Sequence, residues 1–241
     1  MNKFNYRIIS ALLLVISVFS LNSAVAENPV SVTAGATFVS RYNWRGSDYG
    51  AAASIQPALT ATYKGLNVGF WGSYSPNFEE IDTWASYSYQ VPNSITITGV
   101  VTDYFFPDMG LELFNYNNWD DPDGAGAHTI ELGAVIAGPE KLPLVFSAYV
   151  NVHNDEGKNK YFQLDYNATL GENTLGLTVG ATSGSKKNPS YYGSDDFAII
   201  NLGAKVGRTI EFTDKFSLPV FGQFIVNPNA EQAYMVFGFS L

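Results

Sequence analysis

Few residues in this chain of 241 have the types and spacing that catalysis requires. Its only histidines are His128 and His153, and it has no cysteine. His128 lies three residues before Glu131, and His153 lies two residues before Asp155. Neither histidine has a serine at the spacing of a known nucleophile motif. We therefore expect no enzyme, no catalytic residue and no cofactor.

The densest group of oxygen-bearing side chains falls between residues 103 and 127. Its members are Asn115, Asn117, Asn118, Asp120, Asp121 and Asp123, followed by Gly124. Such oxygens suit calcium, but an EF-hand alignment on Asp121 and Asp123 would put Trp119 first and Ile130 last. The sequence therefore predicts no metal site and a solvated acidic loop, which is also long enough to fold inward.

Two arginines, Arg41 and Arg45, flank Trp44. A pair of guanidinium groups can bind an anionic solute or a lipopolysaccharide phosphate in bidentate fashion. The alternative is that they pair with acids such as Glu80 or Asp82 and brace the segment around Trp44, which would then anchor at a membrane interface.

Alternation of apolar and polar residues with a period of two defines the elements that position these side chains. In the first segment Val32, Ala34 and Phe38 share one face, while Thr33 and Thr37 share the other. The pattern recurs in about twelve segments without a comparable helical period, which predicts an antiparallel transmembrane β-barrel. A soluble β-sandwich or lipocalin also alternates, but its exposed face should carry far more Lys and Glu.

The connections between segments alternate in length. The shorter ones are 64–65, 91–93, 137–143, 171–173 and 207–215, and the longer, more polar ones are 40–51, 75–79, 103–127, 153–160, 182–196 and 227–232. Bacterial barrels place short turns in the periplasm and longer loops outside. We therefore expect both ends of the mature chain to be periplasmic.

Strand parity also sorts the side chains into lipid-facing and lumenal sets, because a charge facing lipid is costly. The predicted pore-lining residues are Arg41, Gln56, Trp71, Glu80, Asp82, Trp84, Glu131, Asp165 and Lys205, and those at the external rim are Trp44, Arg45, Asp103 and His128. Four acids against two bases in the lumen predict a weak cation preference. The tryptophans would narrow a pore or simply fill space, so both an open and a plugged lumen remain consistent with the pattern.

The N-terminus reads as a cleaved signal peptide over residues 1–26, leaving a single outer-membrane domain over 27–241. Lys3 and Arg7 precede an apolar run, and Ala24-Val25-Ala26 matches a cleavage site. Cleavage removes two bases and no acid, so the formal net charge falls from -9 to -11. That charge argues against a nucleic-acid partner. The terminal segment, which ends at Leu241, suits delivery to barrel-assembly machinery.

Several motifs resemble a bacterial family of small outer-membrane porins, the TorF type. They include Ser40 to Gly46, Ser54-Ile55-Gln56-Pro57, Tyr63-Lys64-Gly65, Trp71, Glu80-Ile81-Asp82, Asp103 to Pro107, Phe114-Asn115-Tyr116 and His128 to Glu131. The resemblance spans most of the mature chain and implies an outer-membrane location and a channel role without a defined substrate.

Two functions follow as expectations. The first is passive diffusion of small hydrophilic solutes or ions across the bacterial outer membrane, with membrane lipid and lipopolysaccharide around the barrel. The second is a non-conducting structural or binding barrel that displays its loops to partners. The sequence does not choose between them.

Overall fold

The computed structural model describes residues 30–187 and 191–241. The expected signal peptide, residues 1–26, lies outside the described residues. Two three-residue 3₁₀ turns, η1 (Pro92–Ser94) and η2 (Pro107–Met109), lie wholly within the described ranges, and no helix there is long and apolar enough to cross a membrane.

Everything else that is regular within those ranges is β-strand, as the alternation predicts. The strands are β1 (Ser31–Val39), β2 (Tyr42–Trp44), β3 (Ser47–Tyr49), β4 (Ser54–Tyr63), β5 (Leu66–Ser75), β6 (Phe78–Val91), β7 (Ile95–Phe105), β8 (His128–Ala137), β9 (Leu144–His153), β10 (Lys160–Leu170), β11 (Asn173–Thr182), β12 (Ala198–Thr213), β13 (Phe216–Asn227) and β14 (Gln232–Ser240).

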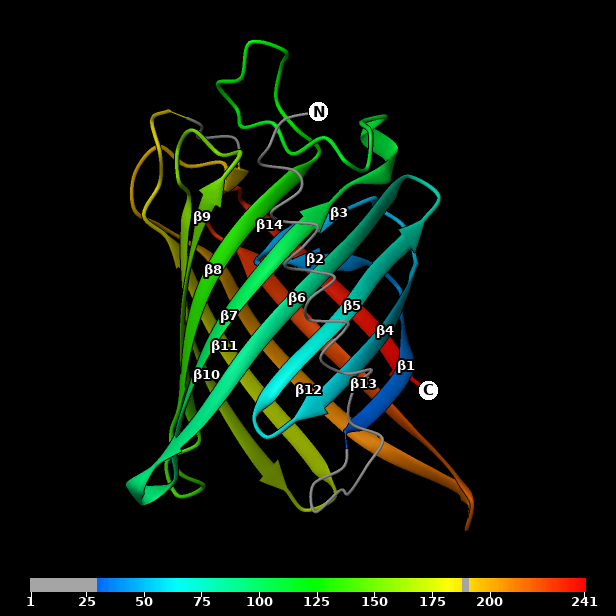
Figure 1. Ribbon diagram of the computed structural model, residues 1–241. Coiled ribbons are helices and arrows are strands. Elements are labelled where there is room, and N and C mark those ends of the chain that lie inside the picture. Colours follow the sequence, from blue (N-terminus) through cyan, green and yellow to red (C-terminus); the bar gives the residue numbers. More distant parts are fainter. Residues whose placement is uncertain (1–29, 188–190) are drawn as a thin grey trace.

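Twelve of these strands form one closed antiparallel barrel (Figure 1), which confirms the predicted fold class. Each strand pairs with its neighbour in sequence, and β1 closes the circle by pairing with β14 on one side and β4 on the other. The register at the closure sets Thr37 opposite Ser240 and Val39 opposite Gly238. Closure leaves the sheet without a free edge over the paired length, which is the condition for a strand to cross lipid.

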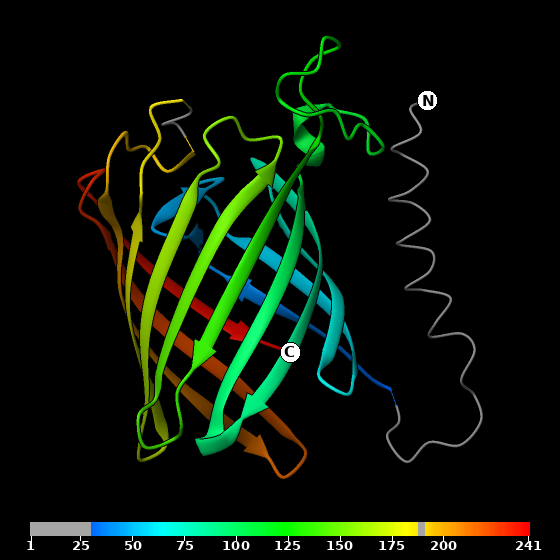
Figure 2. The ribbon, with the colours of Figure 1, turned by 60° about the vertical axis from the view of Figure 1, so that its left-hand side comes forward.

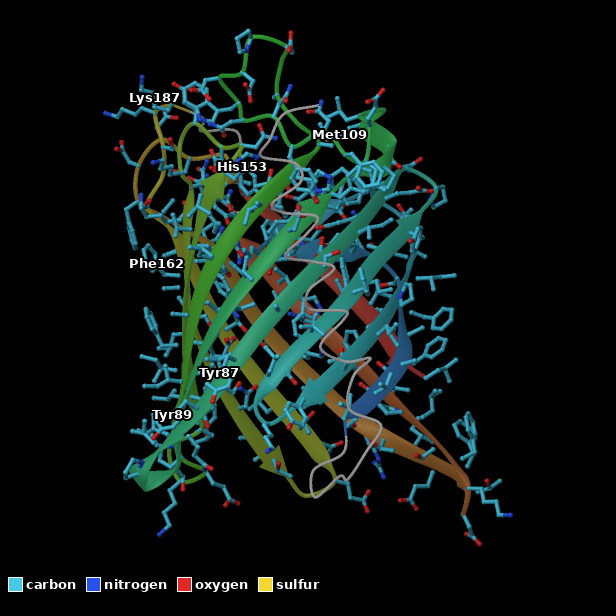
Figure 3. All side chains as sticks on the ribbon, viewed as in Figure 1. Tyr87, Tyr89, Met109, His153, Phe162 and Lys187 are labelled. Atoms are coloured by element: carbon cyan, nitrogen blue, oxygen red, sulfur yellow. The ribbon has the colours of Figure 1, made fainter. Side chains whose placement is uncertain are left out.

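The side chains sort into an apolar outside and a polar inside. Along β10, for example, Leu164 and Tyr166 are exposed on the outer face, while Gln163 and Asp165 point inward and are half-buried. Figure 3 shows Phe162 directed outward and Tyr87 and Tyr89 on the outside of the opposite end of the barrel. This inside-out distribution is typical of a protein that meets lipid along its wall.

The connections separate the two ends of the barrel, which we call the turn end and the loop end. The turn end carries 64–65, 92–94, 138–143, 171–172 and 214–215, and the loop end carries 40–53, 76–77, 106–127, 154–159, 183–197 and 228–231. The prediction of a connection over 207–215 is wrong in its extent, because most of these residues belong to a strand. Residues 207–213 continue β12, because they keep alternating and pair with β13, and the turn is confined to Asp214 and Lys215.

The loop that enters the barrel is the first one, not the longest one. Residues 106–127 rise above the loop end (Figure 1), whereas β2 and β3 form a separate two-stranded hairpin that lies inside the barrel (Figure 2). We call residues 42–49 the inner hairpin.

Candidate functional site

The inner hairpin is built around a tight turn at Arg45-Gly46. Trp44 pairs with Ser47, and the two residues between them have positive φ angles of 51° and 83°. Two consecutive positive φ angles are typical of the primed hairpin turns that favour glycine at the second position. A Cβ at Gly46 would lie 1.9 Å from the carbonyl oxygen of Ile200 on β12, so the turn presses its backbone directly against the far wall.

Arg45 anchors the hairpin to the barrel wall. Its guanidinium makes two hydrogen bonds to the Glu131 carboxylate, of 2.6 and 2.9 Å, and both side chains are almost fully buried, at 8% and 2% exposure. Tyr104 donates a further hydrogen bond to Glu131. Arg45 therefore pairs with a lumenal acid, as the alternative interpretation expected, but the partner is Glu131 rather than Glu80 or Asp82.

Aromatic rings surround the same guanidinium. Its carbon lies 4.3 to 4.5 Å from the ring centroids of Trp44, Tyr149 and Tyr161, a distance range in which cation–π attraction operates. Arg45 also donates to the hydroxyl of Tyr192, in the 183–197 loop, and burial raises the pKa of that phenol. The site is fully assembled from side chains of this chain, which leaves Arg45 no free bidentate face for an outside anion.

Trp44 and Arg45 thus lie inside the barrel, and not at the external rim where the sequence pattern predicted them. Trp44 stacks on Tyr192 and meets Tyr104 edge-on, with centroid separations of 6.1 and 5.8 Å. The reason is the inward fold of the hairpin, which turns residues of an outer loop into lumenal ones. Trp44 therefore packs inside the barrel instead of anchoring at a lipid interface.

Glu80 and Asp82, both buried on β6, face the base of the hairpin. They interact with the buried Tyr42, whose ring also packs against Trp71 at 5.4 Å and Phe78 at 6.1 Å. Glu80, Asp82 and Trp71 thus lie on the inward face, and the hairpin covers them.

Two cavities lie inside the barrel beside the inner hairpin. The loop-side cavity, of about 740 Å³, is lined by the hairpin, residues 191–193, and the loop-end residues of β13 and β14 with the connection between them. The turn-side cavity, of about 580 Å³, is lined by β1, β4 and β11 to β14, and by Tyr42 and Asn43 of the hairpin. Arg41 lines both, and it is the residue that the two cavities share.

Arg41 therefore lies where the two cavities approach each other. It forms a 2.6 Å ion pair with Asp48 of β3 and lies 5.9 Å from the Tyr234 ring centroid. Its side chain keeps 37% exposure, far more than that of Arg45.

The remaining residues of the predicted pore lining lie on the inward face. Gln56 and Lys205 line the turn-side cavity. Asp165 accepts hydrogen bonds from Thr178 and Gln163, and the Trp84 ring lies over Gly69, where an added Cβ would come within 2.8 Å of it.

Asp103 and His128, both predicted from the sequence to lie at the external rim, meet at the loop end of the barrel. His128 Nδ1 lies 2.8 Å from Asp103, and its Nε2 lies 2.6 Å from the Leu113 carbonyl oxygen. Tyr116 stacks on His128 and donates to Asp103, and burial raises the pKa of the Tyr116 phenol. These contacts tie down the start and middle of the 106–127 loop.

The acidic tip of that loop satisfies its own polar groups. The Asp121 carboxylate accepts from the Asn118 backbone N–H at 2.6 Å, and Asp120 accepts from the Asn118 side chain. Within the described residues, no group of three or more His, Asp or Glu side chains is arranged to hold a metal ion.

Sequence reasoning missed the tyrosines that enclose Arg45. Tyr104, Tyr149 and Tyr161 occupy inward positions by parity, so a sign of their role was present. The pore-lining residues predicted from the sequence are charged residues, tryptophans and Gln56, and include no tyrosine. Tyr191 and Tyr192 lie in an irregular loop, where parity has no meaning.

Solved structures match this chain at low sequence identity. The crystal structure of Acinetobacter baumannii OccAB3 is 7% identical, with a TM-score of 0.43, and the match covers 85% of this chain and 58% of that one. The structure of Pseudomonas aeruginosa OprD is 10% identical, with a TM-score of 0.38, and the match covers 90% of this chain and 66% of that one. The chain thus spans less than two thirds of the length of either protein.

No curated protein matches the sequence. A family model does match, over residues 23–229, and its description is Gcw_chp, a bacterial protein of unknown function. Because that match spans most of the 241 residues, the chain belongs to the bacterial family Gcw_chp.

Proposed function

We propose that this protein is a non-enzymatic channel of the bacterial outer membrane, through which small hydrophilic solutes or ions diffuse passively. The closed barrel, its apolar outer wall and its polar interior support a membrane location. The resemblance to TorF-type porins and the expected signal peptide point the same way.

In this proposal the loop end faces the outside and the turn end faces the periplasm. The lengths of the connections at the two ends support that orientation. The partners are then outer-membrane lipid and lipopolysaccharide around the wall, small solutes in the lumen and the barrel-assembly machinery during biogenesis, with no nucleic acid.

The observation that carries the channel proposal is the pair of cavities that share Arg41. One extends from Arg41 toward the loop end and the other toward the turn end. A solute that crosses the barrel would pass between the inner hairpin and the wall formed by β13, β14 and β1. The inner hairpin is then the constriction.

A second function, a non-conducting structural or binding barrel, is favoured by what lies beside Arg41. Val39, Ile225 and Val236 form a buried apolar cluster on this wall, with Phe221 and Tyr234 packed against it. Phe221 lines the turn-side cavity and Tyr234 the loop-side cavity, so the cluster lies between the two. If it stays dry, the barrel displays its loops without conducting.

Planar-bilayer recordings separate the two functions. We expect stepwise conductance from the wild-type protein and larger steps when residues 42–49 are replaced by a short Gly-Ser linker. Val39 and Ser54 are paired neighbours, so a short linker can join β1 to β4. Deleting 115–125 from the outer loop is the matched control and should leave the step size unchanged.

The recordings can also contradict the proposal. No steps from the wild-type protein at any voltage would exclude the channel and leave the binding barrel. If the conductance steps grow on deletion of 115–125 and not on removal of the hairpin, the constriction lies in the 106–127 loop and not at the inner hairpin.

A further inference from the structure

The inward charges that strand alternation predicts differ by sign in their access to the cavities. The four acids among them, Glu80, Asp82, Glu131 and Asp165, line neither cavity, whereas the two bases, Arg41 and Lys205, line the turn-side cavity. A count of lumenal charges suggests cation preference. Of these charges, however, only the positive ones line the cavities that an ion can enter.

The four acids do not face the cavities because other groups of this chain pair with them, hydrogen-bond to them or bury them. Glu131 is neutralised by Arg45 and receives the Tyr104 hydroxyl. Asp165 is held by Thr178 and Gln163 on the wall.

Glu80 and Asp82 are buried beneath Tyr42 and the hairpin, at 4% and 8% exposure. A permeating ion in either cavity therefore meets none of these carboxylates directly.

Lys205 is the base in the turn-side cavity that has no acidic partner within the described ranges. The register sets it opposite Gly176 on β11 and Gln223 on β13, and the glycine leaves space beside its stem, since a Cβ there would meet only Asn167 and Lys205 at 3.5 Å or more. Its ammonium lies 3.9 Å from the Phe221 ring centroid. None of the ion pairs among the described residues includes Lys205.

The groups around Lys205 can complete a site for an anion. Thr37, Gln56 and Gln223 line the same cavity and offer hydroxyl and amide donors. A partly buried cation without a carboxylate gains most from an anionic ligand, because pairing offsets the cost of its desolvation.

The other charges of the two cavities are paired. Arg41 is neutralised by Asp48, which lines the loop-side cavity, and Arg208 at the turn end pairs with Glu172. The uncompensated fixed charge of the path is therefore the Lys205 ammonium.

We propose that the turn-side cavity binds small anions of the carboxylate or phosphate class at Lys205, with Arg41 at its upper end, and that the channel is consequently anion-selective. The selectivity rests on the proposed channel function, whereas the binding site does not.

Reversal potentials test the selectivity. Under a KCl gradient centred near 0.1 M, where the Debye length is about 10 Å, the wild-type channel should prefer chloride over potassium. Lys205→Gln should lower the ratio of chloride to potassium permeability to about unity or below. Lys215→Gln, in the exposed turn after β12, removes the same charge away from both cavities and should leave the ratio unchanged.

Binding provides a readout that needs no conductance. Calorimetric titration of the detergent-solubilised full chain with succinate, and separately with inorganic phosphate, should give heat for the wild type and Lys215→Gln but not for Lys205→Gln. Circular dichroism of each variant checks that the barrel is folded.

Each result decides one proposal. Potassium preference in the wild type, equal ratios in the two lysine variants, or no binding of either anion would overturn the anion site while leaving a channel. Anion binding without any conductance would overturn the channel and keep the site.

Discussion

At the scale of single residues, the Arg45–Glu131 pair shows how a buried charge is tolerated inside the barrel. The guanidinium and the carboxylate are matched by two hydrogen bonds, and tyrosine hydroxyls and aromatic faces take up the rest of their surfaces. Such a pair stabilises little relative to an apolar replacement, but removing one partner leaves a buried charge unpaired.

We expect Glu131→Gln to destabilise the folded barrel by roughly 3 to 5 kcal/mol, because Arg45 would then be buried without a counter-charge. Urea unfolding in lipid vesicles measures the loss. Asp165→Asn is the matched control, since Asp165 is held by the neutral groups of Thr178 and Gln163 and should lose less. Equal losses would show that Arg45 does not depend on the carboxylate charge.

At the scale of elements, the inner hairpin depends on one residue that cannot carry a side chain. Gly46 combines a φ of 83° with direct contact between its Cα and the β12 backbone, and its carbonyl accepts from Asn227 at 3.2 Å. The Gly46 backbone therefore positions the hairpin tip against the β12 backbone and the Asn227 side chain of β13, in addition to the Arg45 ion pair.

We expect Gly46→Ala to push the hairpin tip away from β12 and to speed hydrogen exchange of the amides at 42–49, as measured by mass spectrometry. Gly110→Ala is the control. Gly110 also has a positive φ, of 68°, but nothing lies within 4 Å of an added Cβ. Both variants bear the left-handed strain of about 1 kcal/mol or more, so faster exchange at 42–49 in the control as well would contradict a contact effect.

At the scale of the whole molecule, the barrel is apolar on the outside and polar within. Leu164 near the middle of β10 and Leu170 at its turn end are both exposed, at 46% and 58%. A soluble barrel would tolerate an arginine equally well at either position, whereas a lipid-embedded one would not.

We expect Leu164→Arg to cost roughly 2 to 4 kcal/mol of folding free energy in lipid vesicles, and Leu170→Arg to cost about 1 kcal/mol or less. The depth dependence follows from the lower cost of a charge close to the interface. Reversible unfolding of both variants in the same vesicles measures it. No difference between the two positions would argue against a membrane-spanning wall.

Much of the fold was predictable because it depends on a local signal. Period-two alternation reports which side of the wall each residue faces, so positions such as Glu131, Asp165 and Lys205 could be placed inward without any tertiary contact. The extent of β12 was harder to predict, since Gly207 and Arg208 resemble turn residues and only pairing with β13 extends the strand to Thr213.

The sequence by itself determined the barrel, its strand number near twelve and the inward charges that continue the strand pattern, because each follows from short-range alternation. The tertiary structure decided which of those charges face open space. Arg45 meets a carboxylate 86 positions away, and Gly46 meets Ile200, through packing that no local pattern encodes. The inner hairpin covers Glu80, Asp82 and Glu131 and leaves Arg41 and Lys205 uncovered, and this selective covering converts a list of lumenal residues into a candidate anion site.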